Sequence, residues 1–364
     1  MKTATSCKNR ISAKHFVLCL SIPIIMFGMA LQAQAESFSI EGGYYVGTDG
    51  SAIDQAYGTG TIPNNVYNSD LSGTNTIGSS GVDTGTWGTR GGNYDVEYPH
   101  DGQNIDAISF GPGINAETIT TYYFSLDFYS GYDTGPYAEG SGTEAAGGTG
   151  TAPSNVYSSI ANGTNVNSFP GPDLGIEPYT GGNVDAFDLQ NFISPGSYPL
   201  YFSLDLFGEE GIDFDDDGED DITVNGAEIL VSSGDGTFSS FLSAEDLGLE
   251  DDDNLDALAM LSDGSWLFST DWESCGLEGS AVDDASGTGR KPANIYQSYG
   301  DGTNTLWLSS EAFGIPSGKD AEYYGANLDA LDVACLQNPV PEPATLLLFG
   351  FGLAGAGIFR RRRV

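Results

Sequence analysis

Basic side chains are scarce in this chain of 364 residues, which has 51 Asp and Glu but only 12 Lys and Arg. Eight of the bases lie in the first 14 or the last five residues, so four bases stand against 50 acids between Glu36 and Val340. Nucleic-acid binding depends on Lys and Arg that neutralise phosphates. This acidic body is therefore excluded as a partner for nucleic acids and for anionic lipids.

Histidine and cysteine are also rare, with two and four copies. His15 and two of the cysteines lie in the N-terminal leader described below, which leaves one histidine, His100, in an exposed turn. Paired-histidine metal sites are thus excluded, and no phosphate loop, nucleophile elbow, zinc spacing or dinucleotide fingerprint occurs. Cys275 and Cys335 remain, and in an oxidising compartment we expect them to form a disulfide rather than reactive thiols.

Long apolar runs are confined to the two ends of the chain. Residues 1–35 combine a basic start, an apolar stretch and the small residues Ala33 and Ala35, a pattern that signal peptidase cuts. We therefore predict a secretory signal peptide and a mature protein that begins near Glu36. The alternative is a retained anchor helix, which Pro23 and the cleavage pattern disfavour.

The C-terminal end has three parts in sequence. Pro341, Glu342 and Pro343 precede an apolar run over residues 344–359, which is followed by Arg360, Arg361, Arg362 and Arg363. A helix of this length spans about 24 Å and, with its flanks, can just cross a hydrocarbon core of roughly 30 Å. The arginines favour a cytoplasmic end, which places the acidic body outside the inner membrane.

This ending, residues 339–364, resembles the PEP-CTERM sorting signal of Gram-negative bacteria. The resemblance implies processing by an exosortase-type membrane transpeptidase, transient residence in the inner membrane, and surface display or release in species that make exopolysaccharide. It implies nothing about the activity of the exported domain. The alternative is a plain single-pass membrane anchor.

The middle of the chain is built from repeats. The motif Asn-x-Asp-Ala recurs at intervals of 79, 71 and 73 residues, beginning at Asn104, Asn183, Asn254 and Asn327. A second motif resembling Tyr-Phe-Ser-Leu-Asp follows the first three copies, beginning at Tyr123, Tyr201 and Leu267. Third and fourth motifs, Pro-x-Asn-Val-Tyr and Gly-Thr-Asn, complete most units, and the second unit has Ala227–Val231 in the third place. Short apolar segments between Gly, Asp and Pro are typical of strands.

Four short strands per unit, in four units without helical periodicity, predict an all-β protein: a four-bladed β-propeller over residues 36–338. Gly43–Asp49 resembles the second motif, but no copy of the first motif precedes it. Asn327–Val333 contains the first motif, but no copy of the second motif follows it. Together they are expected to complete one blade, because pairing the two ends removes two exposed sheet edges. The alternative, tandem β-sandwiches, is not excluded by strand spacing.

The repeated Asn-x-Asp-Ala motif has two interpretations. Asn and Asp can bond their own following backbone and set the turn into a strand, while Ala fits where strands crowd an axis. We favour this structural role. The alternative is that the four aspartates converge on the axis, where their repulsion would require a cation.

One acidic loop has the pattern of a calcium site. Between Asp213 and Ile222, carboxylates stand at loop positions 1, 3, 5 and 9 and a glycine at position 6, namely Asp213, Asp215, Asp217, Asp221 and Gly218. Alternating carboxylates around a sharp turn suit a hard, oxygen-seeking cation. The loop resembles those of integrin alpha-chain propellers, and that resemblance implies calcium bound within a blade. The alternative is a solvated acidic loop, which we also expect for Glu250–Asp253.

These patterns predict a secreted, surface-sorted, non-enzymatic protein of the cell envelope or exopolysaccharide matrix, which acts through calcium-supported adhesion or scaffolding. Two alternatives stay open. The protein is an extracellular polysaccharide hydrolase that uses two of its many carboxylates, or it is a carbohydrate-binding protein that uses exposed aromatic rings.

Overall fold

The structure is a computed structural model of the chain. It describes residues 36–39, 66–69, 71, 74–79, 105–109, 121–126, 153–160, 162–176, 182–189, 199–206, 224–271, 273–285, 291–313, 315 and 328–333. The chain divides into two compact units, Met1–Ala33 and Gln34–Val364, and all of the described residues lie in the second.

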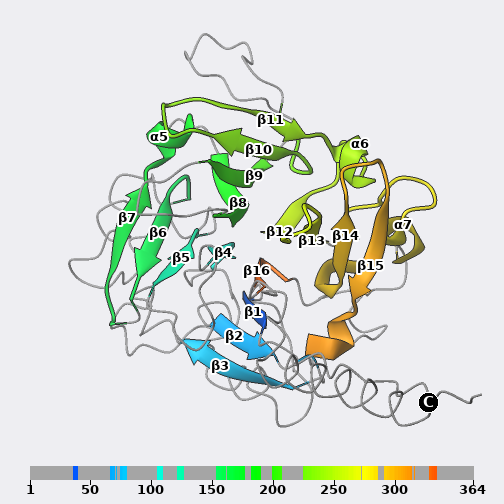
Figure 1. Ribbon diagram of the computed structural model, residues 1–364, viewed down its shortest axis with the longest axis horizontal. Coiled ribbons are helices and arrows are strands. Elements are labelled where there is room, and N and C mark those ends of the chain that lie inside the picture. Colours follow the sequence, from blue (N-terminus) through cyan, green and yellow to red (C-terminus); the bar gives the residue numbers. More distant parts are fainter. Residues whose placement is uncertain are drawn as a thin grey trace, which may run out of the picture. The chain divides into compact units, whose positions relative to one another are not determined.

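The described strands form four antiparallel sheets of four strands each, which we call blades A to D (Figure 1). From the innermost strand outward, blade A contains β4 (Ile108–Ser109), β5 (Tyr122–Phe124), β6 (Val156–Ser159) and β7 (Asn165–Phe169). Blade B contains β8 (Gly182–Asp188), β9 (Leu200–Leu206), β10 (Ile229–Ser232) and β11 (Phe238–Leu242). Blade C contains β12 (Leu255–Met260), β13 (Trp266–Thr270), β14 (Ile295–Ser298) and β15 (Asn304–Leu308). Blade D contains β16 (Ala330–Asp332), β1 (Glu36–Ser39), β2 (Val66–Ser69) and β3 (Asn75–Ser79).

The four blades are arranged as a propeller. Their innermost strands β4, β8, β12 and β16 contact one another in cyclic order, and β16 contacts both β12 and β4 (Figure 1). The prediction of a four-bladed all-β propeller is therefore confirmed, and the alternative of tandem β-sandwiches is wrong. The repeated motifs predicted the blades because each unit supplies four strands that cannot bury their faces alone.

Blade D closes the ring by joining the two ends of the described chain. The C-terminal strand β16 pairs with the N-terminal strand β1, with Phe38 opposite Leu331. Closure by one C-terminal and three N-terminal strands was predicted, but the assignment of Gly43–Asp49 as the second strand was wrong. Glu36–Ser39 takes that position, because Phe38 supplies the buried aromatic ring that Phe124 supplies in blade A. Gly43–Asp49 itself lies outside the described residues.

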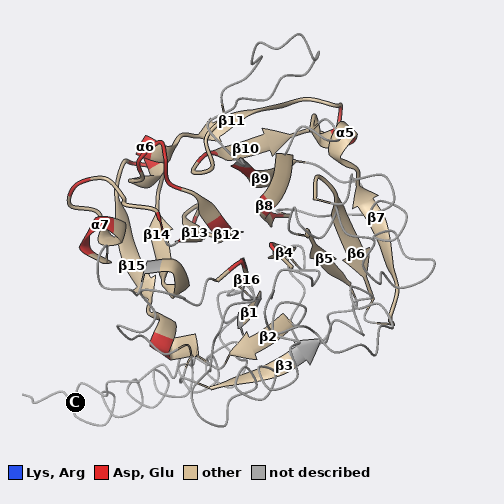
Figure 2. Cartoon of the chain, turned by 180° about the vertical axis from the view of Figure 1, so that it is seen from behind, with Lys and Arg blue, Asp and Glu red and all other residues tan. Residues whose placement is uncertain are grey.

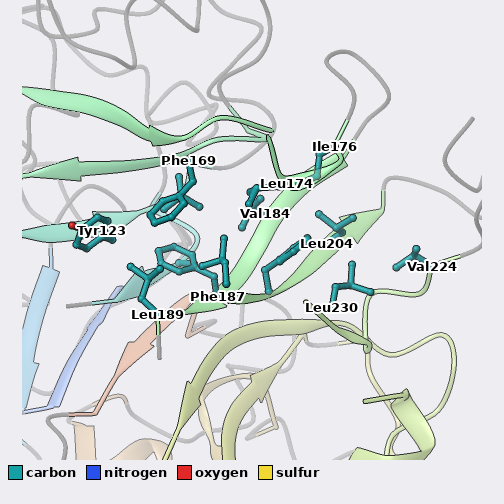
Figure 3. Close-up of a cluster of buried hydrophobic side chains, with 14 residues drawn as sticks. Tyr123, Phe169, Leu174, Ile176, Val184, Phe187, Leu189, Leu204, Val224 and Leu230 are labelled. Atoms are coloured by element: carbon teal, nitrogen blue, oxygen red, sulfur yellow. The ribbon is translucent and has the colours of Figure 1, made fainter. Parts of the chain in front are cut away.

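The hydrophobic core consists of four clusters, each of which lies between two neighbouring blades. Figure 3 shows the cluster between blades A and B, where Phe169, Leu174 and Val184 pack near Phe187 and Leu204. Both faces of each blade are thus covered, so strands bury apolar residues on both sides, as in the pattern BBBBBi of β12. No blade has a complete core without its neighbours.

Three blades share one aromatic pair between their second and third strands. Phe38 stacks on Tyr67 with ring centroids 5.6 Å apart, and Phe124 makes a tilted contact with Tyr157 at 5.7 Å. In blade C the corresponding pair lies at 5.9 Å. Blade B has Leu230 opposite Phe202 instead. Cross-strand aromatic pairs stabilise sheets, which explains why the third motif ends in tyrosine in three of the four units.

Short helices follow the outer strands of three blades and bond to the next blade. These are α5 (Gly171–Leu174), α6 (Ala244–Leu247) and the 3-10 helix η5 (Ser310–Phe313). The carbonyl groups near their ends accept bonds of 2.9 Å from the turn or outer strand of the next blade: Gly236 N–H to Asp173, Gly302 N–H to Asp246, and Asn75 Nδ2 to Phe313. Carbonyl groups at helix ends have no hydrogen-bond partner within the helix. The Gly-Thr-Asn motif of the next blade supplies the N–H groups that donate to them.

Candidate functional site

The Asn-x-Asp-Ala motif links neighbouring blades at their inner strands. Asn183 Nδ2 in blade B donates to Oδ2 of Asp106 in blade A at 2.8 Å, and Asn254 Nδ2 in blade C donates to Oδ2 of Asp185 in blade B at 2.9 Å. Asn183, Asp106 and Asp185 are all buried. The residue after each asparagine also bonds to the preceding blade, since Leu255 N–H donates to the Gly226 carbonyl at 3.1 Å.

A backbone irregularity lies at the motif aspartate in blades B and C. The register between β8 and β9 shifts at Asp185, and that between β12 and β13 shifts at Asp256. A bulge re-aims the side chain of its extra residue. Asn254 approaches blade B so closely that a Cβ on Gly226 would lie 2.2 Å from Asn254 Oδ1.

The motif is therefore structural, but not for the reason predicted. Its asparagines Asn183 and Asn254 bond to the aspartates of the preceding blade, and Asn254 Nδ2 also donates to Asp256 Oδ1 in its own motif at 3.2 Å. The aspartates do not form a metal ring either, since none of the described residues belongs to a group of three or more His, Cys, Asp or Glu that could hold a metal ion. Asp106, Asp185 and Asp256 instead each accept a hydrogen bond from an asparagine of the motif, which offsets the cost of their burial.

Asp188 joins three blades at the end of β8. Its Oδ2 accepts the N–H of Met260 in blade C at 3.0 Å, and its Oδ1 accepts the hydroxyl of Ser109 in blade A at 3.4 Å. Desolvation by burial raises the pKa of Asp188 to about 6, although these hydrogen bonds oppose the shift. Ser109 and Ala259 occupy the corresponding positions of blades A and C, but blade D has Asp332 there. An aspartate thus recurs at this position in two of the four units, a signal that the sequence analysis did not use.

The raised pKa of Asp188 predicts a stability that increases on mild acidification. Between pH about 4 and about 6 the folded protein binds a proton that the unfolded chain, with its ordinary carboxyl pKa, does not bind. Asp188→Asn is therefore expected to stabilise the protein by about 1–3 kcal/mol above pH 7, and the gain should vanish near pH 4. Denaturant unfolding from pH 4 to 8 measures it.

Asp252→Asn supplies the matched control, because it removes the same charge from an exposed side chain. This variant should follow the wild-type pH profile. If Asp188→Asn has a profile parallel to that of the wild type, Asp188 does not titrate in this range.

The sequence analysis predicted that the whole acidic run at residues 250–253 is solvated. This prediction is wrong for one of its four residues, Asp253. Asp251 and Asp252 are exposed, but Asp253 is 2% exposed. Its carboxylate accepts the backbone N–H groups of Glu250, at 2.8 Å, and of Cys275 and Gly276. Asp253 therefore holds together two connections of blades B and C. No sequence pattern distinguishes Asp253 from the other acids of the run, because all four are consecutive carboxylates.

Most of the predicted site residues lie outside the described residues. These are the calcium-loop acids, the cleavage-site alanines, the sorting motif and its arginines: Asp213, Asp215, Asp217, Asp221, Ala33, Ala35, Pro341, Glu342, Pro343, Arg360, Arg361, Arg362 and Arg363. Cys275 is exposed, with its Sγ 3.6 Å from the Glu273 carbonyl oxygen, whereas Cys335 is outside the described part. The calcium site and the disulfide therefore stay predictions.

No helix among the described residues is long and apolar enough to span a membrane. Residues 344–359, where the sequence predicts such a helix, are not among them.

Comparison with known proteins identifies the C-terminal end. Residues 339–363 match the PEP-CTERM protein-sorting motif. No curated protein matches the chain. The extracellular domain of the one-component system BT4673 from B. thetaiotaomicron matches over 67% of this chain, with 11% identity and a TM-score of 0.24. The match spans 25% of that solved chain, so this protein corresponds to about a quarter of its length. The chain is thus a four-bladed β-propeller with a PEP-CTERM sorting motif, exported for sorting by an exosortase to the cell surface or the extracellular space.

Proposed function

We propose that the protein is a non-enzymatic component of the cell envelope or exopolysaccharide matrix, where it acts through calcium-supported adhesion or scaffolding. The observation that carries this proposal is the joining of a sorting motif to a propeller whose body has 50 acids and four bases. A body of this charge remains soluble and repels other copies of itself until cations intervene.

The exposed acids of the described residues are concentrated around blades B and C. Figure 2 shows Asp and Glu on α6, on the loop before β12 and on α7 (Ala281–Ala285). The exposed side chains there are Glu245, Glu250, Asp251, Asp252, Glu273, Glu278 and Asp284. Carboxylate oxygens are the ligands that calcium prefers. Divalent ions shared between two such surfaces would join neighbouring molecules, or join the protein to an acidic polysaccharide.

The calcium loop at Asp213–Asp221 is the second part of the proposal. This loop belongs to blade B in sequence, between β9 and β10. Calcium bound there would stabilise the folded protein as well as support adhesion, because a ligand that binds only the native state shifts the folding equilibrium.

Thermal unfolding of the exported protein with excess Ca²⁺ and with EDTA tests the calcium site. At 100 times its dissociation constant the ion should stabilise the native state by about 2.7 kcal/mol. Asp215→Ala combined with Asp217→Ala should abolish the shift. The control is Asp251→Ala combined with Asp252→Ala, which removes the same charge from an exposed acidic run and should retain the shift. An unchanged midpoint in the wild type would contradict calcium binding and redirect attention to assays of glycan binding and turnover.

A further inference from the structure

Strand β1 begins at the residue that follows the predicted signal-peptide cleavage site. The small residues Ala33 and Ala35 end the predicted leader, and β1 covers Glu36–Ser39. No residue therefore separates the predicted cut from β1. The proposed function makes no use of this arrangement, in which a processing site adjoins a strand that closes the ring.

β1 is an inner strand of its sheet, with neighbours on both sides. Blade D has the order β16-β1-β2-β3, so β1 pairs with β16 along one edge and with β2 along the other (Figure 1). Glu36, the residue after the predicted cut, is itself paired with Ser69 of β2. Phe38 lies opposite Leu331 on one side and Tyr67 on the other. Both edges of β1 are thus occupied in the closed ring.

The central side chains of β1 are buried as well. Ser37 is 3% exposed and donates its hydroxyl proton to Asn68 Oδ1 at 2.7 Å, and Phe38 is 0% exposed. The Phe38 ring contacts the rings of Tyr67 and Phe313 in the cluster between blades C and D. Withdrawal of β1 would empty this position and leave open edges on β16 and β2.

A signal peptidase requires a different arrangement of the same residues. It recognises small side chains at the third and first positions before the cut. A peptide that is bound in extended form offers its backbone groups and alternate side chains to the protein that binds it. A strand that is paired on both edges cannot offer those groups. The Ala35–Glu36 bond is therefore accessible only while β1 is outside the sheet.

We propose that removal of residues 1–35 must precede closure of the ring. Hydrolysis of the Ala35–Glu36 bond consumes one water and leaves a carboxylate on Ala35 and a new amino group on Glu36. β1 then enters between β16 and β2 and completes blade D. A chain that closes first keeps its leader, because closure blocks the cut. The inference concerns export and holds for any function of the exported propeller.

Once the ring is closed, the cut depends on rare openings of blade D. Proteolysis of a folded protein follows the population of the open form when opening and closing are faster than cleavage. A substitution that weakens the packing of β1 should therefore accelerate the cut. Phe38→Ala is that substitution, because it removes the buried ring of β1.

Cleavage of the full chain by purified bacterial signal peptidase tests the inference. The precursor is folded in detergent before the enzyme is added, and mass spectrometry follows the loss of residues 1–35. The comparison is a spacer variant with Glu-Gly-Ser-Gly-Ser-Gly inserted between Ala35 and Glu36. The spacer keeps a glutamate after the cut and moves the cut away from β1. We expect the spacer variant to be cut at least about tenfold faster than the wild type.

The two alanine variants separate the packing of β1 from general effects. Phe38→Ala should be cut at least about tenfold faster than the folded wild-type precursor. Ile77→Ala, which truncates a 45% exposed side chain on β3 of the same blade, should be cut as slowly as the wild type. When the enzyme is present during synthesis, all four chains should be cut alike, because none of them has yet closed its ring.

Hydrogen exchange at residues 37–39 and 330–332 shows whether the ring is closed in each sample. A wild-type precursor that is protected there and is still cut as fast as the spacer variant would overturn the inference. An unprotected precursor must become protected after the cut, and continued rapid exchange would mean that the cut does not control closure. A chain that is never cut at Ala35–Glu36, even during synthesis, would contradict the inference as well.

Discussion

Replacement of Phe38 by alanine is expected to lower the free energy of unfolding by about 3–5 kcal/mol, the usual cost of truncating a fully buried phenylalanine. Phe38 is 0% exposed, stacks on Tyr67 at 5.6 Å and meets the edge of Phe313 at 5.2 Å. It lies on β1, which is hydrogen-bonded to both β16 and β2. The cavity would therefore form where the N-terminal and C-terminal strands close the ring.

Urea unfolding of the exported protein measures this loss, and hydrogen exchange shows where it acts. The exchange rates of backbone amides should increase more in blade D than in blade B. Ile77→Ala is the control in the same blade, because its side chain is 45% exposed and surface truncations usually change stability by less than about 0.5 kcal/mol. A loss below about 1 kcal/mol for Phe38→Ala would mean that ring closure does not depend on this side chain.

Substitution of Asn183 by aspartate is expected to cost about 3 kcal/mol or more at neutral pH. The change replaces the amide that donates to Asp106 at 2.8 Å with a second carboxylate, and both side chains are buried. Two carboxylates at this distance cannot both remain ionised, so one pKa must rise. Unfolding measured at pH 7.5 and at pH 4.5 should show a penalty that becomes smaller at the lower pH, where the pair shares a proton.

Asn162→Asp is the matched control for this prediction. Asn162 Oδ1 accepts the N–H of Thr164, as Asp235 does for Thr237 and Asp301 for Thr303. Two other blades thus already have the aspartate, and the control should be neutral. An equal effect of the two substitutions would mean that added charge alone, rather than the bond between blades, destabilises the protein.

The sequence predicted the arrangement of strands well because repetition makes the same element visible several times. The copies beginning at Asn104, Asn183, Asn254 and Asn327 set the number of blades, and the incomplete unit at the C-terminal end predicted that the ring is closed by both ends. The wrong partner for β16 had a local cause. Gly43–Asp49 and Ser37–Ser39 both contain aromatic residues near the predicted N-terminus, and only packing against Tyr67 distinguishes them.

The roles of individual polar residues were not visible in the same way. Asn-x-Asp-Ala was correctly given a structural role, but its hydrogen bonds run between residues about 70 to 80 positions apart. The structural roles of Asp188 and Asp253 were not predicted, because an aspartate is expected to be exposed to solvent unless its hydrogen-bond partner is known. Their partners are backbone N–H groups on other connections or blades, which any residue could supply.

By itself, the sequence determined the export and sorting of this protein and the number of its blades. A sorting motif is a contiguous stretch of sequence that other proteins recognise directly. Each sequence repeat corresponds to one blade, so the number of repeats gives the number of blades. Only the tertiary structure decided which strand closes the ring, which carboxylates are buried and how neighbouring blades are joined. Those properties depend on contacts between residues distant in the chain, where packing and desolvation act and local patterns carry little information.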